Sequence, residues 1–358
     1  MMNFVRRIPV FLTVAVLASA YAGAGWDYEV HYSGPKTRTT DTAWHPDILP
    51  GYESRYVDQG ESFDGPCRST IIRKLCAGGS RRAYLYIHGF NDYFFQSEMG
   101  ERFVDSGFNF YAVDLRRYGR SLEPWQYPFN VRDQKEYFAD IDSALSQIRR
   151  DGNSDITLSG HSTGGLTVAL FVAEKGARCG VNRVVTDSPF LEWNFSRFMR
   201  GVAIPLAGFA GKIFPEAKIR QAHCDGYAYS LLKDHHGEWT YDTVWKMVYS
   251  PPVTLGWVHS IDRAHDLLMK KAGHITVPVL VMHSSRKVDG CSWTPAFQSG
   301  DAVLDPAEIQ KRGKKLGRDP QVSTIDDGLH DLILSSPSAR EAAYDTIFGF
   351  IRRSCVLW

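Results

Sequence analysis

Short apolar runs recur along the chain and predict a series of buried strands. Ala83–Ile87 and Asn109–Val113 are mostly apolar, with no strict alternation of polar and apolar positions. Such runs are typical of strands that are buried on both faces of a sheet. Four later runs predict further strands, at Ile156–Leu158, Arg183–Thr186, Pro278–Met282 and Gln321–Ile325. Two weaker edge strands are expected near Tyr52–Val57 and Ser69–Leu75.

Stretches with a helical repeat lie between these runs. In Gln134–Arg149, large apolar side chains recur at spacings of three and four, which predicts a helix with one face packed on the sheet. Similar stretches predict helices at Gly164–Glu174, Ala307–Leu316 and Ser338–Arg352. Strands that alternate with helices predict an α/β fold with a mostly parallel sheet covered on both faces.

Residues from about 190 to 277 interrupt this rhythm. The segment contains helical pieces, four prolines and no convincing strand. It predicts a helical cap inserted into a single α/β domain. Its aromatic density is about that of the whole chain, so aromatic content alone does not mark it as a lipid-binding lid.

The first 22 residues have the layout of a secretory signal peptide. Arg6 and Arg7 precede the apolar run Ile8–Leu17, and alanines follow it. The apolar stretch of roughly 15 residues is shorter than the ~20 that cross a bilayer, so a permanent membrane anchor is the weaker alternative. We expect cleavage after Ala20 or Ala22, a mature domain over 23–358, and a secreted or periplasmic protein. The export route stays open.

Charge and cysteines narrow the classes of partner. The 358 residues carry a formal net charge of +1, which provides no broad basic field for nucleic acid. The six cysteines are compatible with disulfides in an oxidising compartment, and Cys67 with Cys76 is the favoured pair among fifteen full pairings. The group His223, Cys224, His235 and His236 lacks the ligand spacing of a zinc site, so no metal is expected.

The strongest chemical signal is the sequence Gly160-His161-Ser162-Thr163-Gly164. It directly follows a predicted strand and directly precedes a predicted helix, which is the setting of a nucleophile elbow. Glycines on both sides of the serine allow strand and helix to approach closely without Cβ clashes. The pattern predicts Ser162 as a nucleophile, with His161 pointing away as a packing or hydrogen-bonding residue.

A serine hydroxyl needs an imidazole to accept its proton and a carboxylate to orient that imidazole. His330 follows the last predicted strand and is the favoured base, while His283 ends a strand itself. Asp289 lies in the loop after strand Pro278–Met282 and precedes His330, which is the chain order this fold requires. Asp289 is therefore the predicted acid. Its alternatives are a turn-capping role for Asp289 and the rival acids Asp301 and Asp305.

Two backbone N–H groups are expected to stabilise the oxyanion. One belongs to Thr163, directly after the nucleophile, and the other to Phe90, which follows His88-Gly89 at the end of an earlier strand.

Three segments together resemble the monoacylglycerol lipase and lysophospholipase group, which shares its domain with the serine aminopeptidases of the S33 type. They are His88-Gly89-Phe90-Asn91-Asp92, Asp114 to Ser121, and Gly160 to Gly165. The resemblance covers about Ala83 to Arg352 and implies an α/β-hydrolase fold with a cap. It places the family triad on Ser162, Asp289 and His330. The chain departs from the group at Asn91-Asp92, where a Glu-His pair is common, and at Arg117-Tyr118, where the group has Gly-His.

These features predict a secreted serine hydrolase that cleaves carboxylic esters, including lipid esters such as monoacylglycerols or lysophospholipids, through an acyl-enzyme and without a cofactor. One alternative is an aminopeptidase, which would need a cap carboxylate such as Glu192, Glu216 or Glu238 to hold the substrate ammonium. Another alternative is a non-catalytic binding protein on the same fold. The cap is expected to set substrate choice, and Trp193 and Phe198 are its first candidate residues.

Overall fold

A computed structural model describes residues 28–354 of the chain. The predicted signal peptide, residues 1–22, lies outside the described residues. Nine strands form the main sheet, and they are β1 (His45–Pro46), β2 (Glu53–Ser62), β3 (Gly65–Lys74), β4 (Arg82–Ile87), β5 (Asn109–Asp114), β6 (Asp155–His161), β7 (Arg183–Asp187), β10 (Val279–Ser284) and β11 (Gln321–Ile325).

The strand order in this sheet is β1-β2-β3-β5-β4-β6-β7-β10-β11. The strands from β5 to β11 pair in parallel, whereas β1, β2 and β3 pair antiparallel at one edge. The carboxyl ends of the parallel strands therefore meet along one edge of the sheet, which is where open α/β sheets build their sites.

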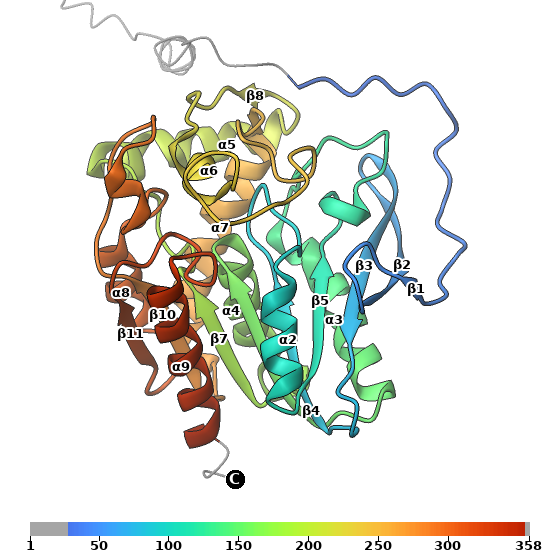
Figure 1. Cartoon of the computed structure of the whole chain (residues 1–358). Coiled ribbons are helices and arrows are strands. Elements are labelled where there is room, and N and C mark those ends of the chain that lie inside the picture. The colour runs from blue at the N-terminus through green and yellow to red at the C-terminus, as the bar shows by residue number, and fades with distance from the viewer. Residues whose placement is uncertain (1–27, 355–358) are drawn as a thin grey trace, which may run out of the picture.

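Strand β4 shows why the central strands lack a polar face. Ala83, Leu85 and Ile87 point into one core cluster, and the intervening Tyr84 and Tyr86 point into another. Both faces are covered because helices pack on each side (Figure 1). One face carries α3 (Tyr137–Arg150), α4 (Thr163–Lys175) and α8 (Pro306–Gly313), and the other carries α2 (Ser97–Asp105) and α9 (Pro337–Ser354).

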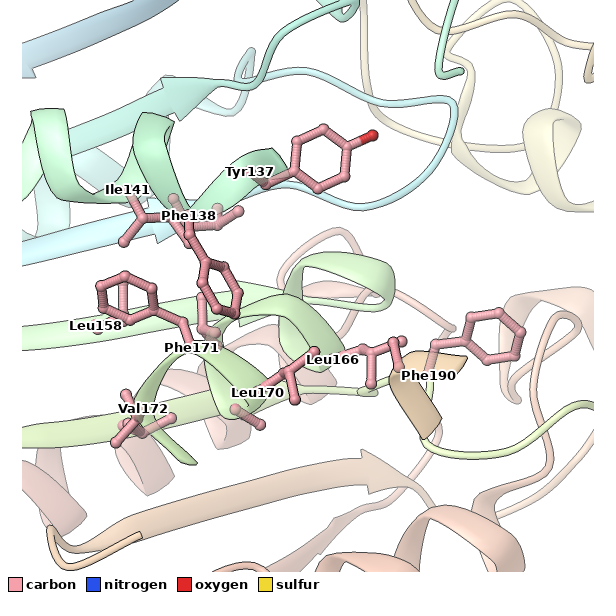
Figure 2. Packing of buried hydrophobic residues seen from close by; sticks show 14 of the residues in the cluster. Tyr137, Phe138, Ile141, Leu158, Leu166, Leu170, Phe171, Val172 and Phe190 are labelled. Atoms are coloured by element: carbon pink, nitrogen blue, oxygen red, sulfur yellow. The ribbon is translucent and has the colours of Figure 1, made fainter. Parts of the chain in front are cut away.

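The larger core lies between the sheet and helices α3 and α4. Figure 2 shows Phe138 and Ile141 of α3 beside Phe171 of α4, with Leu158 of β6 close by. The rings of Phe138 and Phe171 meet edge to face, with centroids 5.2 Å apart. This packing fixes α4, and α4 begins at the residue after Ser162.

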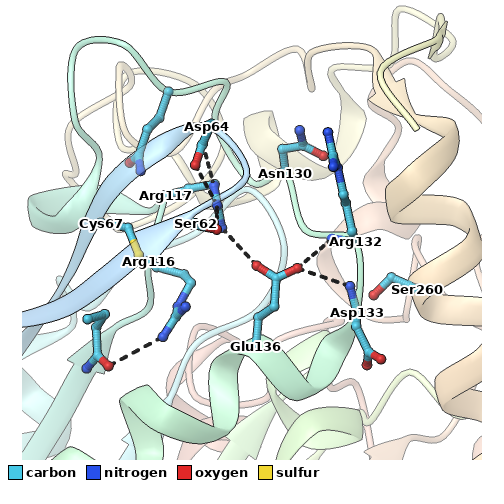
Figure 3. Close-up of polar contacts among 12 residues, drawn as sticks. Ser62, Asp64, Cys67, Arg116, Arg117, Asn130, Arg132, Asp133, Glu136 and Ser260 are labelled. Carbon is cyan, nitrogen blue, oxygen red and sulfur yellow. Dashed lines mark hydrogen bonds and ion pairs between the residues drawn. The ribbon is translucent and has the colours of Figure 1, made fainter. Parts of the chain in front are cut away.

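The antiparallel edge is tied to the centre by a buried arginine. Arg117 has no exposed side-chain surface and donates two hydrogen bonds of 2.7 Å to Asp64, in the turn between β2 and β3. It also contacts Ser62 at 2.6 Å and Glu136, before α3, at 3.4 Å (Figure 3). Arg117 stands where the resembled group has glycine, and its side chain links the β2–β3 hairpin to the segment after β5.

Most predicted elements match the structure within a few residues, and three differ clearly. Helix α2 has no predicted counterpart. Strands β2 and β3 are longer than the predicted edge strands.

Between β7 and β10 the chain leaves the sheet and forms α5 (Ile204–Ile213), α6 (Gly226–Leu231) and α7 (Leu255–Lys271). This segment also contains a pair of two-residue strands, β8 (Lys218–Ile219) and β9 (Val253–Thr254). We call residues 188–278 the insertion, and Figure 1 shows it above the carboxyl ends of the strands.

The predicted Cys67–Cys76 pair is wrong. Cys67 and Cys76 are both free, and a disulfide joins Cys224, in the insertion, to Cys291, in the loop after β10. Cys67 lies near the start of β3, where its neighbours Pro66 and Arg68 pair with β2, whereas Cys76 follows the end of the same strand. The extended strand between them holds the two thiols too far apart for a disulfide. In residues 28–354, none of the helices combines the length and apolar character that a bilayer crossing requires.

Candidate active site

Ser162 lies in a strained turn between β6 and α4. Its φ of 53° and ψ of −118° lie in a region that residues with a side chain rarely adopt. A Cβ on Gly160 would lie 2.5 Å from backbone atoms of Gly164, and a Cβ on Gly164 would lie 2.3 Å from the carbonyl oxygen of His88. Both glycines are therefore required by the close approach of strand and helix, as the nucleophile-elbow pattern predicts.

The structure brings Ser162 and His330 together. His330 follows β11, and its Nε2 lies 3.0 Å from Oγ of Ser162. Its Nδ1 lies 2.9 Å from Oδ2 of Asp301. With Nδ1–H donated to the carboxylate, Nε2 is left free to accept the serine proton, which is the arrangement that activates a serine. The serine, histidine and aspartate are all buried.

The carboxylate at His330 belongs to Asp301, so the prediction of Asp289 is wrong. Asp289 is 82% exposed and forms an ion pair of 2.7 Å with Lys287. The loop after β10 folds back, because the N–H of Asp301 donates to Arg286 and the N–H of Val288 donates to Asp301. This return brings Asp301 beside the end of β10. Its Oδ1 accepts hydrogen bonds from the N–H groups of Val303 and Leu304, both at 2.8 Å.

Asp301 was only a rival candidate in the sequence, since several aspartates in this loop satisfy the required chain order. The sequence around the two aspartates offers only a weak distinction, because Val303 and Leu304 follow Asp301 closely, whereas Asp289 follows the apolar Val288 and precedes Gly290. A carboxylate that orients a buried imidazole must itself be buried, and Asp301 has 0% exposure.

The two expected oxyanion donors belong to segments that adjoin the nucleophile. Thr163 begins α4, where backbone N–H groups have no partner within the helix. Phe90 follows Gly89, and a Cβ on Gly89 would lie only 3.0 Å from Cβ of Ser162. Among the described residues, neither the N–H of Phe90 nor that of Thr163 donates to a protein acceptor. Both groups are thus available to a charged oxygen on the substrate.

The turn that carries Phe90 is fixed by His88 and Asp114. Nε2 of His88 accepts from the N–H of Leu115 at 3.0 Å, and its Nδ1–H donates to the carbonyl of Gly89 at 2.8 Å. This pattern requires a neutral ring, and burial lowers the pKa of His88, which agrees with it. Asp114 accepts from the N–H of Phe94 at 2.9 Å and from the side chain of Arg120 at 2.8 Å.

The insertion covers the site with aromatic side chains. Trp257 of α7 packs on Phe90, with ring centroids 4.9 Å apart, and Tyr227 of α6 meets the ring of His330 at 5.7 Å. Trp193 is buried against Trp257 and His265, whereas Phe198 is 63% exposed on the outside of the insertion. Of the two residues expected to influence substrate choice, the structure therefore places Trp193 in the core of the insertion and Phe198 on its surface.

Charged groups are buried directly behind the nucleophile. Nδ1 of His161 lies 3.7 Å from Asp92 and 3.6 Å from Asp331. Burial alone would lower the pKa of His161, but Asp331 and Asp92 outweigh this and raise the pKa to about 9. Burial would raise the pKa of Asp92, but Lys246 and His161 hold it well below its usual value. Burial, together with Asp331, raises the pKa of Asp187 well above the usual range.

The chain matches the family described as "Serine aminopeptidase, S33" over residues 78–336, which is well over half of its length. The chain belongs to this family of α/β-hydrolases. The match spans the turn with Phe90, the elbow, the insertion and the segment with His330. No curated protein matches the chain significantly.

Solved structures agree on the fold of this S33-type hydrolase. It resembles the monoacylglycerol lipase of Paleococcus ferrophilus, with 19% identity and a TM-score of 0.57 over 80% of this chain and 99% of that one. A soluble variant of the monoglyceride lipase of Saccharomyces cerevisiae matches with 17% identity and a TM-score of 0.59 over 84% and 96% of the two chains. Est1E of Butyrivibrio proteoclasticus, in its complex with ferulic acid, matches with 14% identity and a TM-score of 0.52 over 81% and 96%.

Proposed function

We propose that this protein is an exported serine esterase that hydrolyses carboxylic esters with an apolar acyl group. The observation that carries the proposal is the continuous hydrogen-bonded line from Ser162 through His330 to Asp301, with distances of 3.0 and 2.9 Å. In the proposed reaction, His330 takes the serine proton as Oγ attacks the ester carbonyl, and the N–H groups of Phe90 and Thr163 hold the resulting oxyanion.

His330 then returns the proton to the departing alcohol, which leaves an acyl group on Ser162. Water attacks this ester in a second round of the same steps, with His330 again accepting a proton, and the acid is released. The protein groups suffice for both rounds, so the proposal needs no cofactor.

Apolar surroundings support an apolar acyl group. Phe90 contacts Trp257 and Phe129, with ring centroids 4.9 and 5.2 Å apart, so the oxyanion turn lies in an aromatic environment. The outer face of the insertion also exposes large apolar side chains, namely Phe195, Phe198, Val202, Leu206, Phe209, Ile213 and Phe214. A lipid ester, such as a monoacylglycerol or a lysophospholipid, fits this chemistry better than a charged or sugar ester.

The family description also suggests an aminopeptidase, which would need a free carboxylate near the site for the substrate ammonium. The three expected candidates each contact an arginine: Glu192 contacts Arg312 and Arg200, Glu216 contacts Arg132 at 2.6 Å, and Glu238 contacts Arg340 at 3.3 Å. A carboxylate that is already paired is a poor ammonium site, so these contacts favour the esterase.

Labelling with a fluorophosphonate tests the proposal, with Ser162→Ala as the control. We expect the wild type to be labelled at Ser162 and to hydrolyse p-nitrophenyl esters from acetyl to dodecanoyl, while aminoacyl p-nitroanilides remain uncleaved. Labelling without ester hydrolysis, together with nitroanilide cleavage, would establish the aminopeptidase instead. An unlabelled wild type would favour a binding protein.

A further inference from the structure

The insertion contributes a buried cation to the back of the active site. Nζ of Lys246 lies 2.8 Å from Oδ1 of Asp92, and the two side chains are 8% and 1% exposed. Lys246 belongs to the insertion, whereas Asp92 lies two residues after Phe90, in the turn that carries an oxyanion donor. A buried charge pair is costly to break, because the remaining charge is left without a partner.

Neighbouring residues reinforce this contact between the turn and the insertion. Asn91, with a φ of 50°, donates from its side chain to the carbonyl of Met247 and accepts from the N–H of Met247, both at 2.7 Å. The hydroxyl of Tyr93 accepts from the N–H of Asp242 at 2.8 Å. Asn91, Asp92 and Tyr93 thus all bind the segment 242–247. This is where the chain departs from the Glu-His pair of the resembled group.

From Asp92, close contacts between charged side chains lead to the loops that carry Ser162 and His330. Oδ2 of Asp92 faces His161, which precedes Ser162, and His161 also faces Asp331, which follows His330. Among the described residues, Oδ2 of Asp92 and Oδ2 of Asp331 accept no hydrogen bond. The two ring nitrogens of His161 likewise have no hydrogen-bond partner there. The contacts of His161 with the two carboxylates are therefore electrostatic, and these carboxylates raise its pKa, which favours the charged imidazolium.

The four groups form a row in which positive and negative charges alternate, in the order Lys246, Asp92, His161 and Asp331, and their charges sum to zero. Asp187, whose pKa is raised, adds no charge when protonated. Further titratable groups around His161 and the two carboxylates are His88, His330, Tyr86, Tyr118, Tyr227, Tyr241 and Tyr344. Without Lys246, the remaining three groups would carry a net negative charge beside the segments that hold the oxyanion donors, and the transition state itself becomes negative at those donors.

We propose that Lys246 is a positioning residue of the active site, which holds the oxyanion turn and balances the charge behind it, so that Ser162 reacts at full rate only when the insertion is docked. This inference rests on the proposed esterase function. It assigns to the insertion a role in the chemical step, in addition to any role in substrate choice.

The substitution Lys246→Met tests this role, because methionine keeps most of the length and removes the charge. We expect kcat for p-nitrophenyl acetate to fall by about 10- to 100-fold, with KM changed by less than about three-fold, since the loss affects the transition state more than substrate binding. Lys246→Arg restores the charge and should recover most of kcat. Lys233→Met, at an exposed lysine of the insertion, is the matched control and should equal the wild type.

The double variant Asp92→Asn/Lys246→Met separates charge balance from a purely structural effect. In this double variant the remaining pair, His161 and Asp331, has no net charge, so we expect kcat well above that of Lys246→Met alone. Each rate is measured far below the melting temperature of its variant. The inference is overturned if Lys246→Met keeps kcat within about two-fold of the wild type. It is also overturned if the double variant is as slow as the single one.

The pH profile gives an independent readout. The pKa of His161 is raised to about 9, above its ordinary value, so the imidazolium contributes below this pH and is lost as pH rises through it. We expect wild-type kcat to fall above about pH 9, and the fall to be absent in His161→Gln, which starts from a lower rate. A fall that persists in His161→Gln would contradict the role of this charge.

The rate of fluorophosphonate labelling at Ser162 keeps the two proposals distinguishable. If the wild type is labelled but hydrolyses no ester, the esterase proposal fails, and the labelling rates of the same variants still decide the role of Lys246. If ester hydrolysis is seen and all variants react equally, the inference fails and the esterase proposal stands.

Discussion

At the residue scale, the acid of the candidate triad is the sharpest point to test. Asp301→Asn keeps the shape of the side chain but favours the wrong tautomer of His330, so we expect ester turnover to fall by about 10³- to 10⁴-fold. Asp289→Asn is the matched control in the same loop and should retain wild-type turnover, because Asp289 is exposed and contacts Lys287. Steady-state rates with p-nitrophenyl acetate check both. Equal losses in the two variants would contradict the assignment of Asp301.

The nucleophile and base give a second test at this scale. We expect Ser162→Ala and His330→Ala each to lower ester turnover by about 10⁴- to 10⁶-fold while the fold stays intact, since a triad acts as a unit. Circular dichroism verifies the fold, and p-nitrophenyl ester kinetics give the rates. A variant that keeps more than about a tenth of wild-type turnover would exclude that residue from the proposed mechanism.

The sequence indicates Ser162 and His330 because the residues next to each of them are sufficient to identify it. The elbow needs glycines and a serine at fixed spacing, and the base needs only a place after the last strand. Asp301 depends on how a loop of about twenty residues returns to the sheet, through backbone hydrogen bonds to Arg286 and Val288 that any sequence can form. Such a return leaves little trace in the sequence.

At the scale of elements, α7 contacts the site more directly than the segment around Trp193. Trp257 of α7 packs on Phe90 and lines a cavity of about 10 Å³ together with Phe129 and Pro252, which is room for about one water molecule. Trp257→Ala would enlarge this space beside the oxyanion turn. We expect it to raise the rates of longer acyl esters relative to acetyl, as measured on an acetyl to dodecanoyl series.

Trp193→Ala is the matched control within the insertion. Trp193 is 8% exposed and packs against Phe190 and His265, so its loss should lower the free energy of unfolding by about 3 to 5 kcal/mol. The ranking of the acyl series should stay unchanged. If Trp193→Ala alters the ranking and Trp257→Ala does not, substrate choice depends on the start of the insertion.

The sequence predicts the central strands β4 and β5 to within one residue, because both are buried on both faces. The edge strand β11 also has the predicted bounds, Gln321–Ile325, although it is only partly buried. Helix α2 lacks a prediction because it is short, contains Gly100 and buries few apolar side chains, chiefly Met99 and Phe103. In the insertion, β8 and β9 have two residues each, which is too short for any periodicity to show.

At the scale of the whole molecule, the proposed export with cleavage of a signal peptide can be tested by the mass of the protein. The signal-like N-terminus predicts a mature protein that starts near Tyr21 or Gly23, and the Cys224–Cys291 disulfide agrees with an oxidising compartment. Intact mass of the exported protein, with and without reductant, measures both features. A product that retains Met1 would contradict export by cleavage of a signal peptide.

The same disulfide joins the insertion to the loop that carries the proposed acid. It closes a segment with a sequence separation of 67 residues, and Gly226 adds a backbone hydrogen bond of 2.9 Å to Cys291. Closing a loop of this length restricts the unfolded chain, so Cys224→Ala/Cys291→Ala should lower the free energy of unfolding by about 2 to 4 kcal/mol. Cys67→Ala, at a free cysteine, is the control for the loss of a thiol. Urea denaturation of the oxidised proteins gives both values.

The disulfide should also affect the catalytic step, because Asp301 lies ten residues after Cys291 in the anchored loop and Tyr227 of α6 covers His330. We expect Cys224→Ala/Cys291→Ala to lower kcat while the folded fraction remains complete, and dithiothreitol to lower kcat of the wild type without changing the variant. If reduction alters the free energy of unfolding and leaves kcat unchanged, the disulfide anchors the insertion without orienting His330. In that case the docking of the insertion depends on the contacts of Asn91 and Asp92 instead.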